Sequence, residues 1–162
     1  KIYTIFLVFV FYSSLLISQQ PIATNAEKIL KGVVQKEQME ASSLVKNIPF
    51  TNIGPTVMSG RVVDVDVNTE NPTEFYVGYA SGGLWYTNNN GTSFSPVMDS
   101  ANTQNIGDIA VDWKTGTIWV GTGENNSSRS SYAGIGVLKS VDHGKTWINT
   151  GLEDTHHIVE LL

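Results

Sequence analysis

The segment 121–136 holds the densest group of side chains that could recognise a ligand. A carboxylate, two amides, a guanidinium and a phenol lie within it, and such groups form hydrogen bonds with a sugar or a polar peptide. Together with an arginine earlier in the chain, they give five candidate ligand-binding residues: Arg61, Glu124, Asn125, Arg129 and Tyr132. The leading interpretation of the segment is nevertheless a solvated loop, in which glycines and serines merely allow the path of the chain.

No catalytic set accompanies these side chains in the sequence. A Ser–His–Asp arrangement, a phosphate-binding loop and a nucleotide fingerprint are all lacking. His156 and His157 are adjacent, and adjacent residues on a strand point to opposite faces, so we do not expect them to share a metal. We expect no catalytic residue, no metal and no cofactor. Four aspartates are expected to be strand-end and turn groups, with calcium as the open alternative: Asp64, Asp66, Asp108 and Asp112.

Charge and cysteine content exclude several classes of partner. The 162 residues include 10 lysines and arginines against 15 aspartates and glutamates, a net charge of -5. Because no basic cluster is present, nucleic acid is not an expected partner. There is no cysteine, which excludes disulfides and thiolate metal sites.

From residue 60 onward the sequence contains two copies of one unit. GRVVDVDVN at 60–68 matches IGDIAVDW at 106–113, so Asp64 aligns with Asp108. FYVG and GLWYTNNNG then match IWVG and GVLKSVDHG, with one insertion in the second copy. Each copy contains three β-type runs, a turn and a fourth run. Four strands in a repeat of about 40 to 55 residues match one blade of a β-propeller.

Valines alternate with aspartates along the first run of the first copy. Val63, Val65 and Val67 flank Asp64 and Asp66. This period of two predicts a strand with one face in the core and the other elsewhere.

The turn before the fourth run has a similar pattern in both copies. SVDHGKTW at 140–147 and the weaker TNNNGTSF at 87–94 place Asp or Asn after a hydroxyl residue and before glycine. The acid or amide accepts backbone N–H groups, the glycine supplies a positive φ, and the final aromatic residue packs on a neighbouring strand. We interpret the turn residues as structural: Thr87, Asn89, Gly91, Phe94, Ser140, Asp142, Gly144, Thr146 and Trp147.

These turns resemble the Asp-box, or BNR, repeat of sialidase-type and sortilin-type propellers. Including MSGRVVDVDV, NPTEFYVGYASGGLWYT and VGTGENN, residues 50–157 resemble exported bacterial sortilin N-terminal-domain or glycosyl-hydrolase BNR-repeat proteins. The resemblance implies an all-β fold, a β-propeller of four-stranded antiparallel blades with about two blades in this chain. It also implies a scaffold that binds an extracellular protein or glycan, with a structural role for the Asp-box.

A glycoside hydrolase acting on polysaccharide is the alternative function. Xyloglucanase-type propellers resemble this region and carry an acid before a Gly-Gly pair, whereas YASGG at 79–83 has none. Glycosidases need two carboxyl groups across the scissile bond, and Glu124 has no evident partner for that role. Two blades do not close a propeller, so we expect this chain to be an N-terminal fragment. If the protein is a glycoside hydrolase, most of its catalytic carboxylates would then lie beyond the fragment.

The first 48 residues differ from the repeats in composition and in the spacing of their apolar residues. Lys1 precedes an apolar run at 2–17 and polar residues follow, which predicts an export signal at 1–20 and a secreted or cell-surface protein. The run is short for a membrane span, so no stable span is expected, with an uncleaved signal anchor as the alternative. Apolar residues near helical spacing predict a helical spacer within 21–48, and the blades then occupy 49–162.

Overall fold

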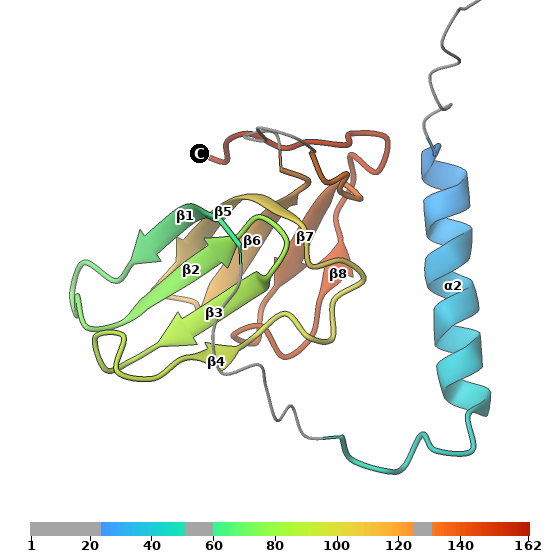
Figure 1. Ribbon diagram of the computed structural model, residues 1–162, viewed down its shortest axis with the longest axis horizontal. Helices are drawn as coiled ribbons and strands as arrows, with labels where there is room; N and C mark the ends of the chain where they lie inside the picture. The colour runs from blue at the N-terminus through green and yellow to red at the C-terminus, as the bar shows by residue number, and fades with distance from the viewer. Residues whose placement is uncertain (1–23, 51–59, 125–130) are drawn as a thin grey trace, which may run out of the picture.

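The computed structural model describes residues 24–50, 60–124 and 131–162, and the repeats within them are β-structure. Within these described ranges, one helix, α2 (Ala26–Ser42), precedes two four-stranded antiparallel sheets that lie side by side (Figure 1). Each predicted copy forms one sheet, so the all-β prediction for the repeats is confirmed. The expected export signal at 1–20 lies outside the described residues.

Both sheets are meanders in which consecutive strands pair. The first contains β1 (Val62–Val67), β2 (Phe75–Tyr79), β3 (Gly83–Thr87) and β4 (Ser95–Pro96). The second contains β5 (Ile106–Asp112), β6 (Thr117–Thr122), β7 (Val137–Ser140) and β8 (Ile148–Asn149). The first pair of each sheet has a register shift near its start, just before the aligned residues Asp64 and Asp108. The repeat in sequence is therefore also a repeat in strand pairing.

The turn between β7 and β8 is closed by side-chain bonds to the backbone. Asp142 Oδ1 accepts the N–H of Thr146 at 2.9 Å, and Ser140 Oγ accepts the N–H of Gly144 at 2.9 Å. Gly144 has a φ of +83, which an L side chain adopts only with strain. Matching bonds in the turn between β3 and β4 come from Thr87, Asn89, Gly91 and Ser93.

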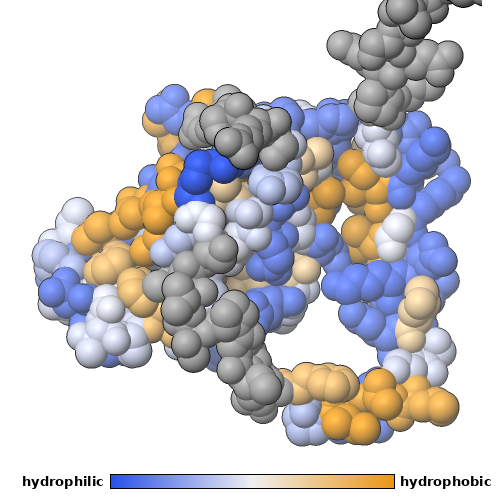
Figure 2. Space-filling view, viewed as in Figure 1, coloured by the Kyte–Doolittle hydropathy of each residue, from blue (hydrophilic) through white to orange (hydrophobic). Residues whose placement is uncertain are grey.

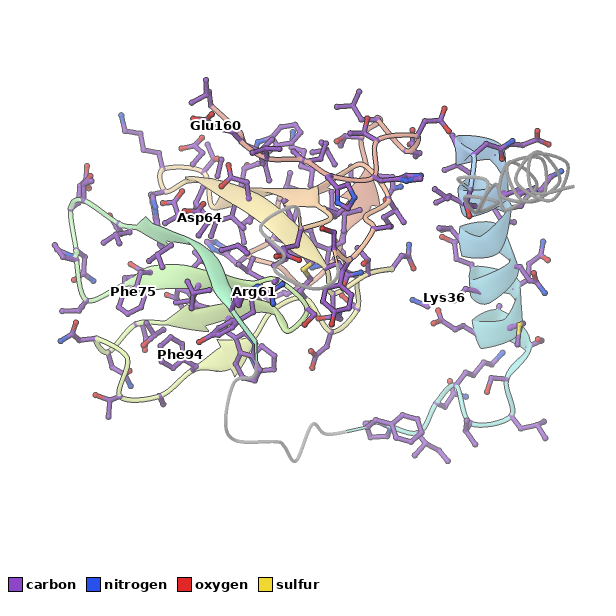
Figure 3. The ribbon with its side chains drawn as sticks, turned by 45° about the horizontal axis from the view of Figure 1, so that its top comes forward. Lys36, Arg61, Asp64, Phe75, Phe94 and Glu160 are labelled. Atoms are coloured by element: carbon purple, nitrogen blue, oxygen red, sulfur yellow. The ribbon has the colours of Figure 1, made fainter. Side chains whose placement is uncertain are left out.

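The aromatic residues after these turns have different neighbours. Phe94 packs edge-on against Phe75 of its own sheet, with ring centroids 6.0 Å apart (Figure 3). Trp147 instead reaches the first sheet, because its Nε1 donates to the carbonyl of Val97 at 3.0 Å. The second turn thus joins the two sheets, whereas the ring contact of the first, among the described residues, is within its own sheet.

The apolar core lies between the two sheets. Its buried side chains come from both repeats, and Leu84, Ile106, Ile118 and Leu138 are at most 1% exposed. Gly78 of β2 leaves room for this contact, since a Cβ there would lie 3.3 Å from Ile106 Cγ2. Burial of these groups is the main force that holds one sheet on the other.

The alternation along β1 produces two unlike faces, as predicted, but the covered face carries the acids. Asp64 and Asp66 are partly buried, whereas Val65 and Val67 remain 45% and 40% exposed. The prediction that these aspartates are strand-end groups is wrong, because they lie inside the strand and bond to the next sheet. In most strands the apolar side chains face the core and the polar side chains face solvent. In β1 the carboxylates face the second sheet, so the valines are left more exposed.

Helix α2 lies within the predicted spacer and makes few contacts with the sheets. The side chain of Asn25 accepts the N–H of Lys28 at 3.1 Å and so caps the helix. Lys36 donates to Asn102 Oδ1 at 3.0 Å, and the N–H of Ala26 bonds to the carboxylate of Asp154. None of its residues is buried, and the space-filling view shows an open gap between the helix and the sheets (Figure 2). Among the described residues, no helix has the length and apolar character to cross a membrane.

Candidate functional site

Carboxylates of β1 accept hydrogen bonds from the backbone of the second sheet. Asp64 Oδ2 accepts the N–H of Ile109 at 3.2 Å, and Asp66 Oδ2 accepts the N–H of Val111 at 2.8 Å. The second oxygen of Asp66 accepts the indole N–H of Trp113 at 2.7 Å. The N–H groups of β5 that face β1 are thereby satisfied by side chains instead of by a paired strand.

The second sheet makes the same type of bond with the C-terminal segment 158–162. Asp108 Oδ2 accepts the N–H of Leu161 at 2.6 Å. The N–H of Ile158 bonds to the carbonyl of Thr122 at 3.1 Å, much as the N–H of Ile106 bonds to that of Ala80 at 3.2 Å. Segment 158–162 therefore contacts the second sheet as the start of β5 contacts the first.

The carboxyl group of Asp64 also affects that of Asp108. Burial raises the pKa of Asp108 above its usual 3.8, the N–H of Leu161 opposes the shift, and the carboxyl of Asp64 adds to it. Figure 3 labels Asp64 on β1 and Glu160 in the C-terminal segment. Sequence reasoning missed this inter-sheet role, although the signal was available in the aligned positions of Asp64 and Asp108.

A second inter-sheet contact is an ion pair at the end of the sheets where β1 and β5 begin and β2 and β6 end. We call this the loop end. Arg61 directly precedes β1, and Glu124 follows β6 by two residues. Arg61 Nη2 lies 2.6 Å from Glu124 Oε1, so two candidate residues that are far apart in the sequence meet across the sheets.

The two partners of this ion pair differ sharply in exposure. The side chain of Arg61 is 48% exposed, whereas that of Glu124 is 0% exposed. The expectation of a solvated loop is therefore wrong at Glu124, although it was the leading interpretation of the segment. Asn125 and Arg129, two further candidates, lie outside the described residues.

One oxygen of the buried carboxylate lacks a hydrogen-bond donor. Among the residues that the structure describes, no donor reaches Glu124 Oε2. The backbone N–H of Glu124 donates to the backbone carbonyl of Tyr132 at 3.0 Å. The backbone of Tyr132, the fifth candidate residue, therefore lies next to that of Glu124. Tyr132 is 41% exposed. Buried polar atoms are nearly always paired, so Glu124 Oε2 is an exception among the described residues.

His156 and His157 are adjacent near the C-terminus. They lie outside any strand, so the reasoning from strand geometry does not apply to them. Their ring centroids are 6.5 Å apart. Across residues 24–50, 60–124 and 131–162, no three His, Cys, Asp or Glu side chains are grouped so that they could hold a metal ion.

Asp142 functions as part of a turn in this structure. Its pKa is lowered to about 2, chiefly by the hydroxyl of Thr146, then by the N–H of Thr146 and the hydroxyl of Ser140. All of these donors belong to the turn itself, and they hold the carboxylate ionised. A carboxylate with its oxygens so occupied has little capacity left for a ligand.

Comparison with known proteins finds no protein-family model that matches this chain and no curated protein that is similar to it. The argument for function therefore comes from the geometry of the molecule.

Proposed function

We propose that this chain is part of an exported β-propeller built from Asp-box blades, and that it binds an extracellular protein or glycan without catalysing a reaction. The observation that carries this proposal is the Arg61–Glu124 pair at the loop end. It joins two repeats at one site and combines exposed guanidinium donors with a buried acceptor. Convergent polar groups from several elements are typical of ligand sites.

The propeller assignment is supported by the repeated contact between successive units. The second sheet lies on the first through Asp64 and Ile109, and segment 158–162 lies on the second through Asp108 and Leu161. When each unit contacts the next one through the same geometry, repetition of that contact generates either a closed ring or an open array. We propose the ring, because four-stranded meanders that stack through their inner strands are the blades of propellers.

A paired substitution tests the binding function. Replacing Arg61 by Met together with Glu124 by Leu removes both charges, which avoids leaving one buried charge without its partner. We expect the full natural protein to retain a glycan from a printed array or an extracellular matrix polypeptide, and the double variant to lose that retention while remaining folded. Equal retention by the double variant would contradict the proposal, as would release of reducing ends from β-glucans by the natural protein.

A further inference from the structure

The first sheet has an apolar face that points away from the second sheet, and we call it the outward face. Asp64 and Asp66 of β1 bond to the second sheet, and alternate residues of a strand point to opposite faces. Val65 and Val67 therefore lie on the outward face, and both are exposed. We propose that this face is the docking surface for a further four-stranded unit of the same polypeptide, which contributes a carboxylate to the backbone N–H of Val65. The proposal rests on the ring given above, and it names the face and the acceptor that close the ring.

The first step is the strand register, which is the same in both sheets. In the first sheet Val65 pairs with Val77, and in the second sheet the matching pair is Ile109 and Val120. Ile109 is only 4% exposed, because this face of the second sheet lies on the first, whereas Val65 remains 45% exposed. The outward face therefore repeats an apolar surface that is buried wherever a neighbouring unit lies on it.

The second step is the hydrogen bonding of the first strand in each unit. The N–H of Ile109 bonds to Asp64 of the preceding unit at 3.2 Å, and the N–H of Leu161 bonds to Asp108 of the preceding unit at 2.6 Å. The N–H of Val65 has an acceptor from its own strand, Asp64 Oδ1, at 2.7 Å. In the described part of the chain, no acid of another unit reaches this N–H. An acid from a docked unit would give Val65 the bond that Ile109 and Leu161 already make.

The third step is the choice of the docked unit. Docking by the same contact requires a sheet that presents the face carrying the inter-sheet acid. In a second copy of this chain that face belongs to the second sheet, where Asp108 already bonds to segment 158–162, so a second copy would have to displace this segment. Helix α2 is bonded elsewhere, through Asn102 and Asp154. A further unit of the same polypeptide has neither conflict.

The test uses single cysteines in the full natural protein, since this chain has no cysteine of its own. V65C is compared with E70C in the exposed turn between β1 and β2, and with I109C at the matching buried position. We expect a maleimide to label V65C about 10 to 100 times more slowly than E70C, because a covered thiol is neither accessible nor readily ionised. E70C alone is a sufficient reference if I109C does not fold. Labelling of V65C at the rate of E70C overturns the docking surface and the ring.

Light scattering and hydrogen exchange at single amides identify what covers the face. We expect a monomer in which the N–H of Val65 exchanges within about tenfold of the rate at Ile109, since both would bond to a neighbouring unit. A dimer whose dilution exposes V65C overturns the same polypeptide as the source of the docked unit. A covered V65C with exchange at Val65 more than about a hundredfold faster than at Ile109 overturns the carboxylate.

The binding function is tested separately by the array experiment given above. Exposure of V65C with a ligand still retained overturns the docking surface and leaves that function standing. Retention of nothing by a protein in which V65C is covered overturns the binding function and leaves the docking surface standing.

Discussion

Asp64 on β1 accepts a hydrogen bond from the backbone N–H of Ile109 on β5, so a side chain of one repeat takes the place of a partner strand for the next. Asp108, at the matching position of the second sheet, does the same for Leu161. The stacking of the units thus depends on carboxylates as well as on apolar burial. This relationship leads to the following predictions.

Replacing Asp66 with Ala should destabilise the contact between the sheets. The carboxylate accepts the N–H of Val111 and the indole N–H of Trp113, and both donors would lose their partner. We expect a loss of about 2 to 4 kcal/mol in the free energy of unfolding, measured by urea denaturation followed through tryptophan fluorescence. The control is Glu70→Ala, which removes an exposed acid from the same sheet. Equal midpoints for the two variants would show that Asp66 does not stabilise the stack.

Replacing Gly121 with Ala should displace the C-terminal segment. A Cβ at Gly121 would lie 2.4 Å from Ile158 Cγ2 and 2.7 Å from its Cβ. We expect destabilisation by about 1 to 3 kcal/mol, together with faster hydrogen exchange at the N–H of Ile158, which bonds to Thr122.

The matched control for Gly121 is Gly32 in α2. A Cβ at Gly32 meets nothing within 4 Å, so Gly32→Ala should stabilise the helix by about 0.5 to 1 kcal/mol. A Gly121→Ala variant that melts as the natural protein does, with unchanged exchange at Ile158, would contradict the placement of segment 158–162.

The turn between β7 and β8 should make stability depend on pH, whereas the turn between β3 and β4 should not. The pKa of Asp142 is about 2 in the folded protein against its usual 3.8, so its contribution is fully present above pH 3.8 and is lost as pH falls through 2. Asp142→Asn copies the residue at Asn89 and removes this titration. We expect the difference in melting temperature between natural protein and variant to shrink below pH 4. A constant difference from pH 2 to 7 would exclude this linkage.

Asp108 should have the opposite dependence on pH. Its pKa is raised in the folded protein by burial and by Asp64, so the folded state binds more protons than the unfolded state above pH 3.8. Stability from this group therefore falls as pH rises from 3.8 through the raised pKa. Asp108→Asn removes that loss, so the melting temperature of the variant relative to natural protein should rise with pH between 4 and 7. The reverse trend would show that ionised Asp108 is stabilised in the fold.

The two repeats and the positions of their strands could be predicted because their signals are local. Asp142 bonds to Thr146 and Ser140, all within seven residues, so the pattern SVDHGKT contains the whole turn. The alternation in β1 likewise predicted a strand with two unlike faces. It did not predict which face is covered, because that depends on what the neighbouring sheet presents.

The sequence by itself determined the repeat, the order of the strands and the turns, because each depends on residues that are close together in the chain. The tertiary structure decided what the acidic residues do. Asp64 bonds to a residue 45 positions away, and Arg61 meets a glutamate 63 positions away. Glu124 is buried although the residue types around it predict a polar loop. Such contacts are a property of the packed molecule, and no local pattern of residue types encodes them.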